Sequence, residues 1–177
     1  YRLPDLAGMS WSHTLGNLIT LRRLVPALVL WLAAGVAMAA PAVGDLIRLT
    51  ATRLDGSRVS LDEARGRRAL LALWSPGSLA WRKSMGEFER FAASPEATGI
   101  FVLAVGMNSD AAAIRDFMAA RKAGFPVALR GDDNLGKFDD DHLPVLLIID
   151  SEGRLQRHHT GMFISRSLRE LLAPTKQ

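Results

Sequence analysis

The sequence predicts an α/β fold in which a central mixed β-sheet carries helices on both faces. Three observations lead to this prediction. Continuous apolar runs bounded by turn residues are typical of strands that are buried on both faces of a sheet. Segments with apolar residues at helical spacing separate these runs, and a tight turn joins the last two predicted strands. Strands that alternate with helices and then end in a hairpin and a helix form a mixed sheet.

The first half of this pattern lies between Leu46 and Pro95. A strand is expected at residues 46–50, and Asp55-Gly56-Ser57 is a strong hairpin turn. Ser60 is followed three residues later by Glu63, which predicts a capping box and a short helical turn. A buried strand at residues 69–74 then leads to a helix that begins near Leu79 and ends before Pro95.

The second half repeats the alternation and closes with the hairpin. Further strands are expected at residues 100–105, 125–129, 145–150 and 154–160. A helix is expected over residues 111–121 and should stop near Gly124, while residues 135–138 are expected to form a short helical turn. The last helix is marked by Leu168, Leu171 and Leu172.

Composition limits the possible functions. A chain of 177 residues is long enough for one domain and an additional segment. Lys and Arg total 22 against 18 acidic residues, and this dispersed excess does not indicate a nucleic-acid partner. The sequence has no cysteine, which excludes disulfides, thiolate metal sites and dithiol redox chemistry.

An uncharged apolar run covers residues 24–40, directly after Arg22 and Arg23. The run ends in small residues, with alanines at 37, 39 and 40. This pattern is typical of a secretory signal peptide, and the run is shorter than the roughly 20 apolar residues of a bilayer span. We therefore expect residues 1–39 to be a signal peptide that is cleaved after Ala39.

The alternative is an uncleaved signal anchor with its basic flank inside. Either way the protein is expected in the periplasm or otherwise exported, and it contacts the inner membrane only if the segment is retained. Met9 is a possible translation start, in which case residues 1–8 are extra N-terminal residues.

Four stretches occur in an order that resembles a known family. They are Asp55-Gly56 followed by Val59-Ser60-Leu61, then L-A-L-W-S-P-G-S-L-A-W-R-K-S-M-G-E-F-E at 71–89, Phe125-Pro126-Val127, and Leu143-Pro144 entering V-L-L-I-I-D-S-E-G-R-L. Residues 43–173 are similar in this respect to the thioredoxin-like superfamily. The likeness is to its TlpA/ResA-like redoxin branch of secreted or membrane-tethered thiol–disulfide reductases.

The resemblance places the lost redox centre at two residues. Family members carry W-C-x-x-C-R at a helix N-terminus, where the helix dipole stabilises the attacking thiolate and a second thiol resolves the mixed disulfide. The matching positions hold Ser78 and Trp81, with Gly77 before them and Arg82 after them. An acid that relatives often carry after the strand at 100–105 is also missing, because Met107-Asn108 stands there. Neither Ser78 nor Trp81 can take part in disulfide exchange, so we expect a redox-inactive member of the family.

The resemblance also implies a groove. Pro144 falls where relatives keep a cis-proline, and Leu143 stands where the backbone of relatives pairs with an extended substrate. A protein or peptide partner from the cell envelope is therefore expected, in an accessory role in thiol–disulfide or cofactor-assembly pathways, with no metal and no cofactor. The candidate groove residues are Trp74, Gly77, Ser78, Trp81, Leu143 and Pro144. Two interpretations stay open, since the groove is either still a binding cleft or filled by Trp81.

Other functions are less well supported by the residues. The resemblance supplies one alternative, a thiol–disulfide oxidoreductase by family membership, whose chemistry a cysteine-free sequence does not support. A serine hydrolase built from Ser78, His142 and the acids at 139–141 is conceivable, but the G-x-S-x-G elbow is missing and Ser78 is better interpreted as a helix cap. The same acids lack calcium-loop spacing and are expected to form a solvated loop. His158 and His159 point to opposite faces of a predicted strand and cannot chelate one ion together.

Overall fold

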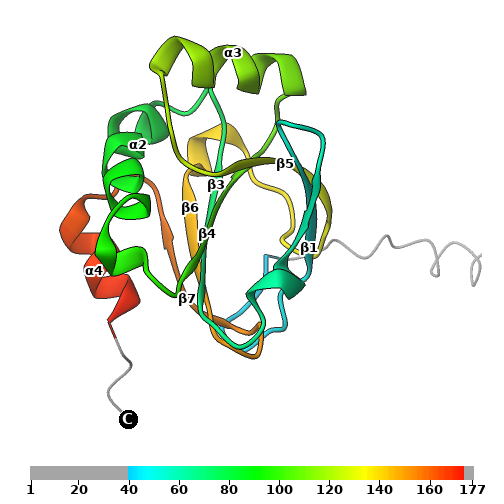
Figure 1. The fold of residues 1–177 in the computed structure, drawn as a ribbon, viewed down its shortest axis with the longest axis vertical. Helices are drawn as coiled ribbons and strands as arrows, with labels where there is room; N and C mark the ends of the chain where they lie inside the picture. The colour runs from blue at the N-terminus through cyan, green and yellow to red at the C-terminus, as the bar shows by residue number, and fades with distance from the viewer. Residues whose placement is uncertain (1–39, 174–177) are drawn as a thin grey trace, which may run out of the picture. The chain divides into compact units, whose positions relative to one another are not determined.

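The predicted apolar strands form the centre of a seven-stranded mixed sheet with the order β2-β1-β5-β4-β3-β6-β7 (Figure 1). The computed structural model describes residues 40–173, so the predicted signal segment at 1–39 lies outside the described residues. None of the helices within that described range is long and apolar enough to cross a membrane.

The elements follow the predicted order closely. The strands are β1 (Leu49–Arg53), β2 (Arg58–Ser60), β3 (Ala69–Trp74), β4 (Phe101–Gly106), β5 (Val127–Asp133), β6 (Val145–Ile149) and β7 (Leu155–Thr160). The α-helices are α2 (Leu79–Ala92), α3 (Ala111–Arg121) and α4 (Ser165–Leu172). Short 3-10 helices are η1 (Leu61–Ala64), η2 (Pro95–Ala97) and η3 (Asp140–His142). The predicted capping box is confirmed at η1. The Ser60 hydroxyl accepts from backbone N–H groups of the turn, and the Glu63 carboxylate accepts from the Ser60 backbone N–H.

The central strand β3 is buried along its whole length, as its unbroken apolar sequence predicts. It pairs with β4 in parallel and with β6 in antiparallel register, so the sheet is mixed. Alternate side chains point to opposite faces. Leu71 therefore faces one core and Trp74 the other.

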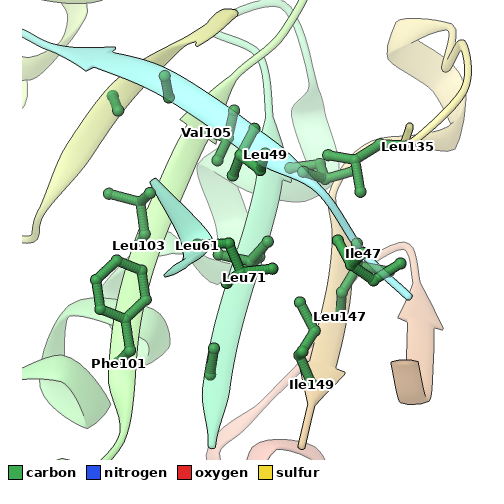
Figure 2. Packing of buried hydrophobic residues seen from close by; sticks show 14 of the residues in the cluster. Ile47, Leu49, Leu61, Leu71, Phe101, Leu103, Val105, Leu135, Leu147 and Ile149 are labelled. Carbon is green, nitrogen blue, oxygen red and sulfur yellow. The ribbon is translucent and has the colours of Figure 1, made fainter. Parts of the chain in front are cut away.

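All three α-helices pack on the face that holds Trp74, and we call this layer the helix-side core. It includes Phe88 from α2, Ile114 from α3 and Leu168 from α4. Figure 1 shows α2 and α4 side by side on this face. The opposite face is covered by β1, by η1 and by the segment around Leu135, as Figure 2 shows. The predicted mixed sheet with helices on both faces is confirmed, although the second face carries only a short 3-10 helix.

Some local predictions differ from the structure. The strands expected at residues 46–50 and 125–129 are found at Leu49–Arg53 and Val127–Asp133. Helix α3 covers the expected residues 111–121, but the residue that caps its end is Lys122, in a left-handed conformation with φ of 50°, and not Gly124. The N–H of Gly124 instead donates to the Glu89 carboxylate of α2 at 2.6 Å. The predicted helical turn at residues 135–138 is wrong, because the segment is irregular there. Leu135 is drawn fully into the core, and Arg130 binds the Gly136 carbonyl at 2.6 Å.

Both ends of α4 are held by charged side chains from other elements. At its start, the Glu87 carboxylate of α2 accepts hydrogen bonds from the backbone N–H and the hydroxyl of Ser165. At its end, Arg68 donates to the Leu172 carbonyl at 2.7 Å, and Arg157 donates to two further carbonyls of the last turn. A carboxylate at the start and guanidinium groups at the end match the helix dipole.

This arrangement predicts an acid-sensitive contact. The hydrogen bond from the Ser165 hydroxyl, and then that from Arg90, lower the pKa of Glu87 below its ordinary value of 4.5. A carboxylate with a lowered folded-state pKa stabilises the fold above its unfolded pKa, and this contribution disappears as the pH falls through the folded value. Glu87→Gln should therefore lower the urea midpoint at pH 7 and flatten its decline below pH 4.5. Glu96→Gln is the control, because Glu96 is exposed, and an equal response of both variants would contradict the assignment.

Candidate functional site

The site lies where β3 ends and α2 begins. After Trp74 the chain turns through Ser75, Pro76 and Gly77, and Ser78 caps the helix. The Ser78 hydroxyl accepts a hydrogen bond from the Trp81 backbone N–H at 3.2 Å, so the predicted role as a helix cap is confirmed. Ser78 is only 3% exposed. Such a cap satisfies one of the free N–H groups of the first helical turn and lies at the positive end of the helix dipole.

The same hydroxyl makes a second bond across the fold. It donates to the Leu143 carbonyl at 2.6 Å, in a buried position. Leu143 precedes Pro144 on the loop that enters β6, and the peptide bond between them is cis. The structure therefore brings Ser78 next to Leu143 and Pro144, as the resemblance predicts.

Both backbone polar groups of Leu143 are engaged inside the protein. Its N–H donates to the Asp140 carbonyl at 3.2 Å, and its carbonyl accepts from Ser78. These are the groups that would pair with an extended substrate according to the resemblance. In this chain they hold the η3 turn and the start of α2 instead.

Trp81 is fully buried beneath the start of α2. Its ring stacks on Trp74 with centroids 5.2 Å apart and an interplanar angle of 25°. Phe88 and Phe125 lie with ring centroids 5.6 Å from it, and Phe163 lies at 6.3 Å. Stacked and edge-on ring pairs at these distances add stabilisation to that gained from burying their apolar surface. Trp81, which the resemblance assigns to the second cysteine position, is thus the centre of an aromatic cluster in the helix-side core.

Three buried donors around this cluster have no hydrogen-bond partner within residues 40–173. They are the indole N–H groups of Trp74 and Trp81 and the hydroxyl of Ser75. A buried unpaired polar group costs about 1–3 kcal/mol. Within residues 40–173 no hydrogen bond offsets this cost for the three groups.

The site does not provide a nucleophile with its base. The Ser78 hydrogen points to the Leu143 carbonyl, and within the described part of the chain no bond joins Ser78 to His142. A hydrolytic serine needs a base within hydrogen-bond reach. Asp139, Asp140 and Asp141 are exposed on η3 and the residue before it, and residues 40–173 contain no group of three or more ligating side chains placed to hold a metal ion.

A shallow groove with a volume of about 380 Å³ opens above the buried cluster. Gly77, Ser78 and Leu143 line it, whereas Trp74, Trp81 and Pro144 are buried and do not. The other lining residues include Leu79, Lys83, Asp140, Asp141 and Met162. Sequence reasoning missed Leu79 and Met162 as groove residues. The signal for Leu79 was available, because a helix residue two positions before the buried Trp81 points away from the core.

The comparisons with known proteins give the fold its class. A putative thiol:disulfide interchange protein DsbE from Chlorobium tepidum is 22% identical, with 75% of this chain and 96% of that chain covered and a TM-score of 0.63. StoA from Bacillus subtilis is 18% identical over 75% of this chain and 100% of that chain, with a TM-score of 0.58. The exposed lipoprotein thioredoxin from Streptococcus pneumoniae is 20% identical over 71% and 97%, with a TM-score of 0.59.

Residues 40–173 therefore form an α/β domain with the thioredoxin fold, and the domain is similar to thiol:disulfide proteins of the DsbE and StoA type. This chain has no cysteine with which to exchange disulfides. No protein-family model matches the sequence. No curated protein sequence matches it significantly.

The bridging role of Ser78 can be measured. Ser78→Ala removes the helix cap and leaves the buried Leu143 carbonyl without its donor, so the free energy of unfolding should fall by about 2–4 kcal/mol. Chemical denaturation of the full-length chain measures this loss. Ser151→Ala is the control, because the Ser151 hydroxyl makes only an exposed contact with Glu152. A loss below about 0.5 kcal/mol, the ordinary range for surface substitutions, would contradict the role assigned to Ser78.

Proposed function

We propose that this protein is a redox-inactive thioredoxin-fold protein of the cell envelope that binds a segment of a partner protein in the groove at the start of α2. The observation that carries the proposal is the pair of internal hydrogen bonds made by the Ser78 hydroxyl. The residue at the attacking position of the redox centre is here a structural link between α2 and the loop before β6.

The loss of redox chemistry is supported by three features that agree with one another. The chain has no thiol, the Ser78 hydroxyl is used in two internal hydrogen bonds, and Trp81 lies in the core. Thiol–disulfide exchange needs a thiolate that attacks and a second thiol that resolves the mixed disulfide. Neither can be supplied at these positions.

A binding role is supported by the surface that remains. Leu79 and Met162 are each 59% exposed, and both line the groove. Ile164, which follows on the same loop as Met162, is 55% exposed. Large apolar side chains gathered on one exposed surface are typical of interaction sites. The loop that carries Met162 and Ile164 is bonded to α2, because the N–H of Phe163 donates to the buried Ser84 hydroxyl at 3.0 Å.

The cellular location is supported by the sequence and by two neighbours. Residues 22–40 have the pattern of an export signal. One structural neighbour is described as a secreted disulfide oxidoreductase of Mycobacterium tuberculosis, and another as an exposed lipoprotein. We therefore place this protein in the periplasm or otherwise outside the cytoplasm, anchored to the inner membrane if its leader is retained.

The redox part of the proposal is tested by reduction of insulin with dithiothreitol. The full-length chain should give the rate of dithiothreitol alone, because it has no thiol to relay electrons. A thioredoxin with an intact C-x-x-C centre, run at the same concentration, shows that the assay responds. Turnover by the cysteine-free chain above the background rate would overturn this part and favour an oxidoreductase.

The binding part is tested by site-specific photocrosslinking in cells. A photoreactive amino acid replacing Leu79 should give discrete adducts, whereas the same group replacing Val43, which is 63% exposed and lies outside the groove, should not. Met162→Ser should strongly reduce the adducts formed at position 79, because it removes apolar area from the rim of the groove. Adducts that are the same from both positions, or that are unchanged by Met162→Ser, would contradict binding in the groove.

A further inference from the structure

We infer that the groove at the start of α2 selects a peptide segment that presents apolar and basic side chains together, and that it recognises these side chains instead of pairing with the peptide backbone. This inference rests on the proposed function and deepens it, because it states the chemistry of the partner segment.

The backbone of Leu143 offers an incoming peptide no free N–H, and its carbonyl already accepts one hydrogen bond. The Leu143 N–H and carbonyl are bonded to the Asp140 carbonyl and the Ser78 hydroxyl. The bond between Ser78 and the Leu143 carbonyl is buried, so giving it up for a peptide would leave the Ser78 hydroxyl unsatisfied, at a cost of about 1–3 kcal/mol. Selection among peptide segments is therefore assigned to the side chains that line the groove.

The apolar requirement comes from Leu79 and Met162. Both side chains are more than half exposed and both line the groove, so a leucine-sized side chain of a ligand can bury area against them. The flexible thioether of methionine adapts to different apolar shapes. These contacts favour apolar residues in the ligand but do not select one particular apolar side chain.

The basic requirement comes from Asp140 and Asp141. Both line the groove, and neither is in an ion pair in the described portion of the chain. Asn108 donates to one oxygen of Asp140 at 3.1 Å, which orients that carboxylate. Its other oxygen lies over Gly77, so close that a Cβ atom at Gly77 would stand 2.5 Å from it. This carboxylate is thus held at the mouth of the groove with one oxygen free for a cation.

Lys83 also lines the groove, and it stands on α2 while the acids stand on η3. It makes no ion pair with them, although all three are exposed. Two carboxylates against one ammonium leave the lining with an excess of negative charge. An arginine or lysine of the ligand that faces η3 is therefore attracted, while an acidic ligand residue at the same place is repelled.

The test uses three labelled peptides of equal length with blocked termini. One alternates leucine with arginine, one has glutamate in place of arginine, and one has serine in place of leucine. Fluorescence polarisation with the full-length chain measures their dissociation constants. The leucine–arginine peptide should bind about tenfold more tightly than the leucine–glutamate peptide at low salt. This ratio should shrink as salt is added, because exposed charges are screened.

Matched variants assign the effect to residues. Asp141→Asn should weaken binding of the leucine–arginine peptide by about two- to fivefold, as expected for one exposed ion pair. Asp140→Asn should act in the same direction and keeps the acceptor for Asn108. Asp116→Asn should have no effect, because Asp116 is exposed on α3 outside the groove. Leu79→Ser should weaken every peptide that contains leucine, whereas Val43→Ser should weaken none.

The outcomes separate this inference from the proposed function. If the arginine and glutamate peptides bind equally well and both depend on Leu79, the charge selection is overturned while binding in the groove stands. If binding does not depend on Leu79, or if none of the peptides binds, the inference is overturned, and photocrosslinking at Leu79 decides the proposed function by itself.

Discussion

The hydroxyl of Ser78 joins two segments that are 65 residues apart in the sequence. It caps α2 by accepting from Trp81, and it donates to the Leu143 carbonyl on the loop before β6. The geometry of the groove depends on this link, since it sets the distance between its two main walls. In a redox-active member of the fold the same position would have to remain free to react. Here both hydrogen-bonding capacities of the hydroxyl serve the structure.

The aromatic cluster is the second feature of the segment that begins α2. The rings of Trp74 and Trp81 stack beneath this helix and are fully buried. Removing a buried tryptophan ring costs about 3–5 kcal/mol. Trp81 is thus part of the core. The proposed binding function belongs to the groove, where Leu79, Met162 and the acids of η3 are exposed.

Much of the fold could be predicted from local sequence. The apolar run at β3 and the helix from Leu79 were placed correctly because burial on both faces and helical spacing leave clear patterns. The extent of α3 was also predicted, but its capping residue was not, because a lysine in a left-handed conformation stands where a glycine was expected. The irregular chain around Leu135 follows from tertiary packing, for which no local signal exists.

The candidate site was predicted in part. The resemblance brought Ser78 and Leu143 together, and the structure joins them by a hydrogen bond. The sequence left open whether Trp81 lines a binding cleft or fills it. In the structure its ring is buried beside Trp74, and Trp81 is not among the residues that line the groove. The contribution of Asp140 and Met162 to the groove could not be predicted, since it depends on how η3 and the loop before α4 approach α2 in three dimensions.

The central claim is that Ser78 and Trp81 are structural parts of the domain. The free energy of unfolding of the reduced Ser78→Cys/Trp81→Cys double variant tests it most directly. The account predicts a loss of at least about 4 kcal/mol relative to the natural sequence, because the ring packing of Trp81 and the strong hydroxyl bond of Ser78 are removed together. A double variant as stable as the natural protein would contradict the account, since the redox centre would then be dormant and not rebuilt.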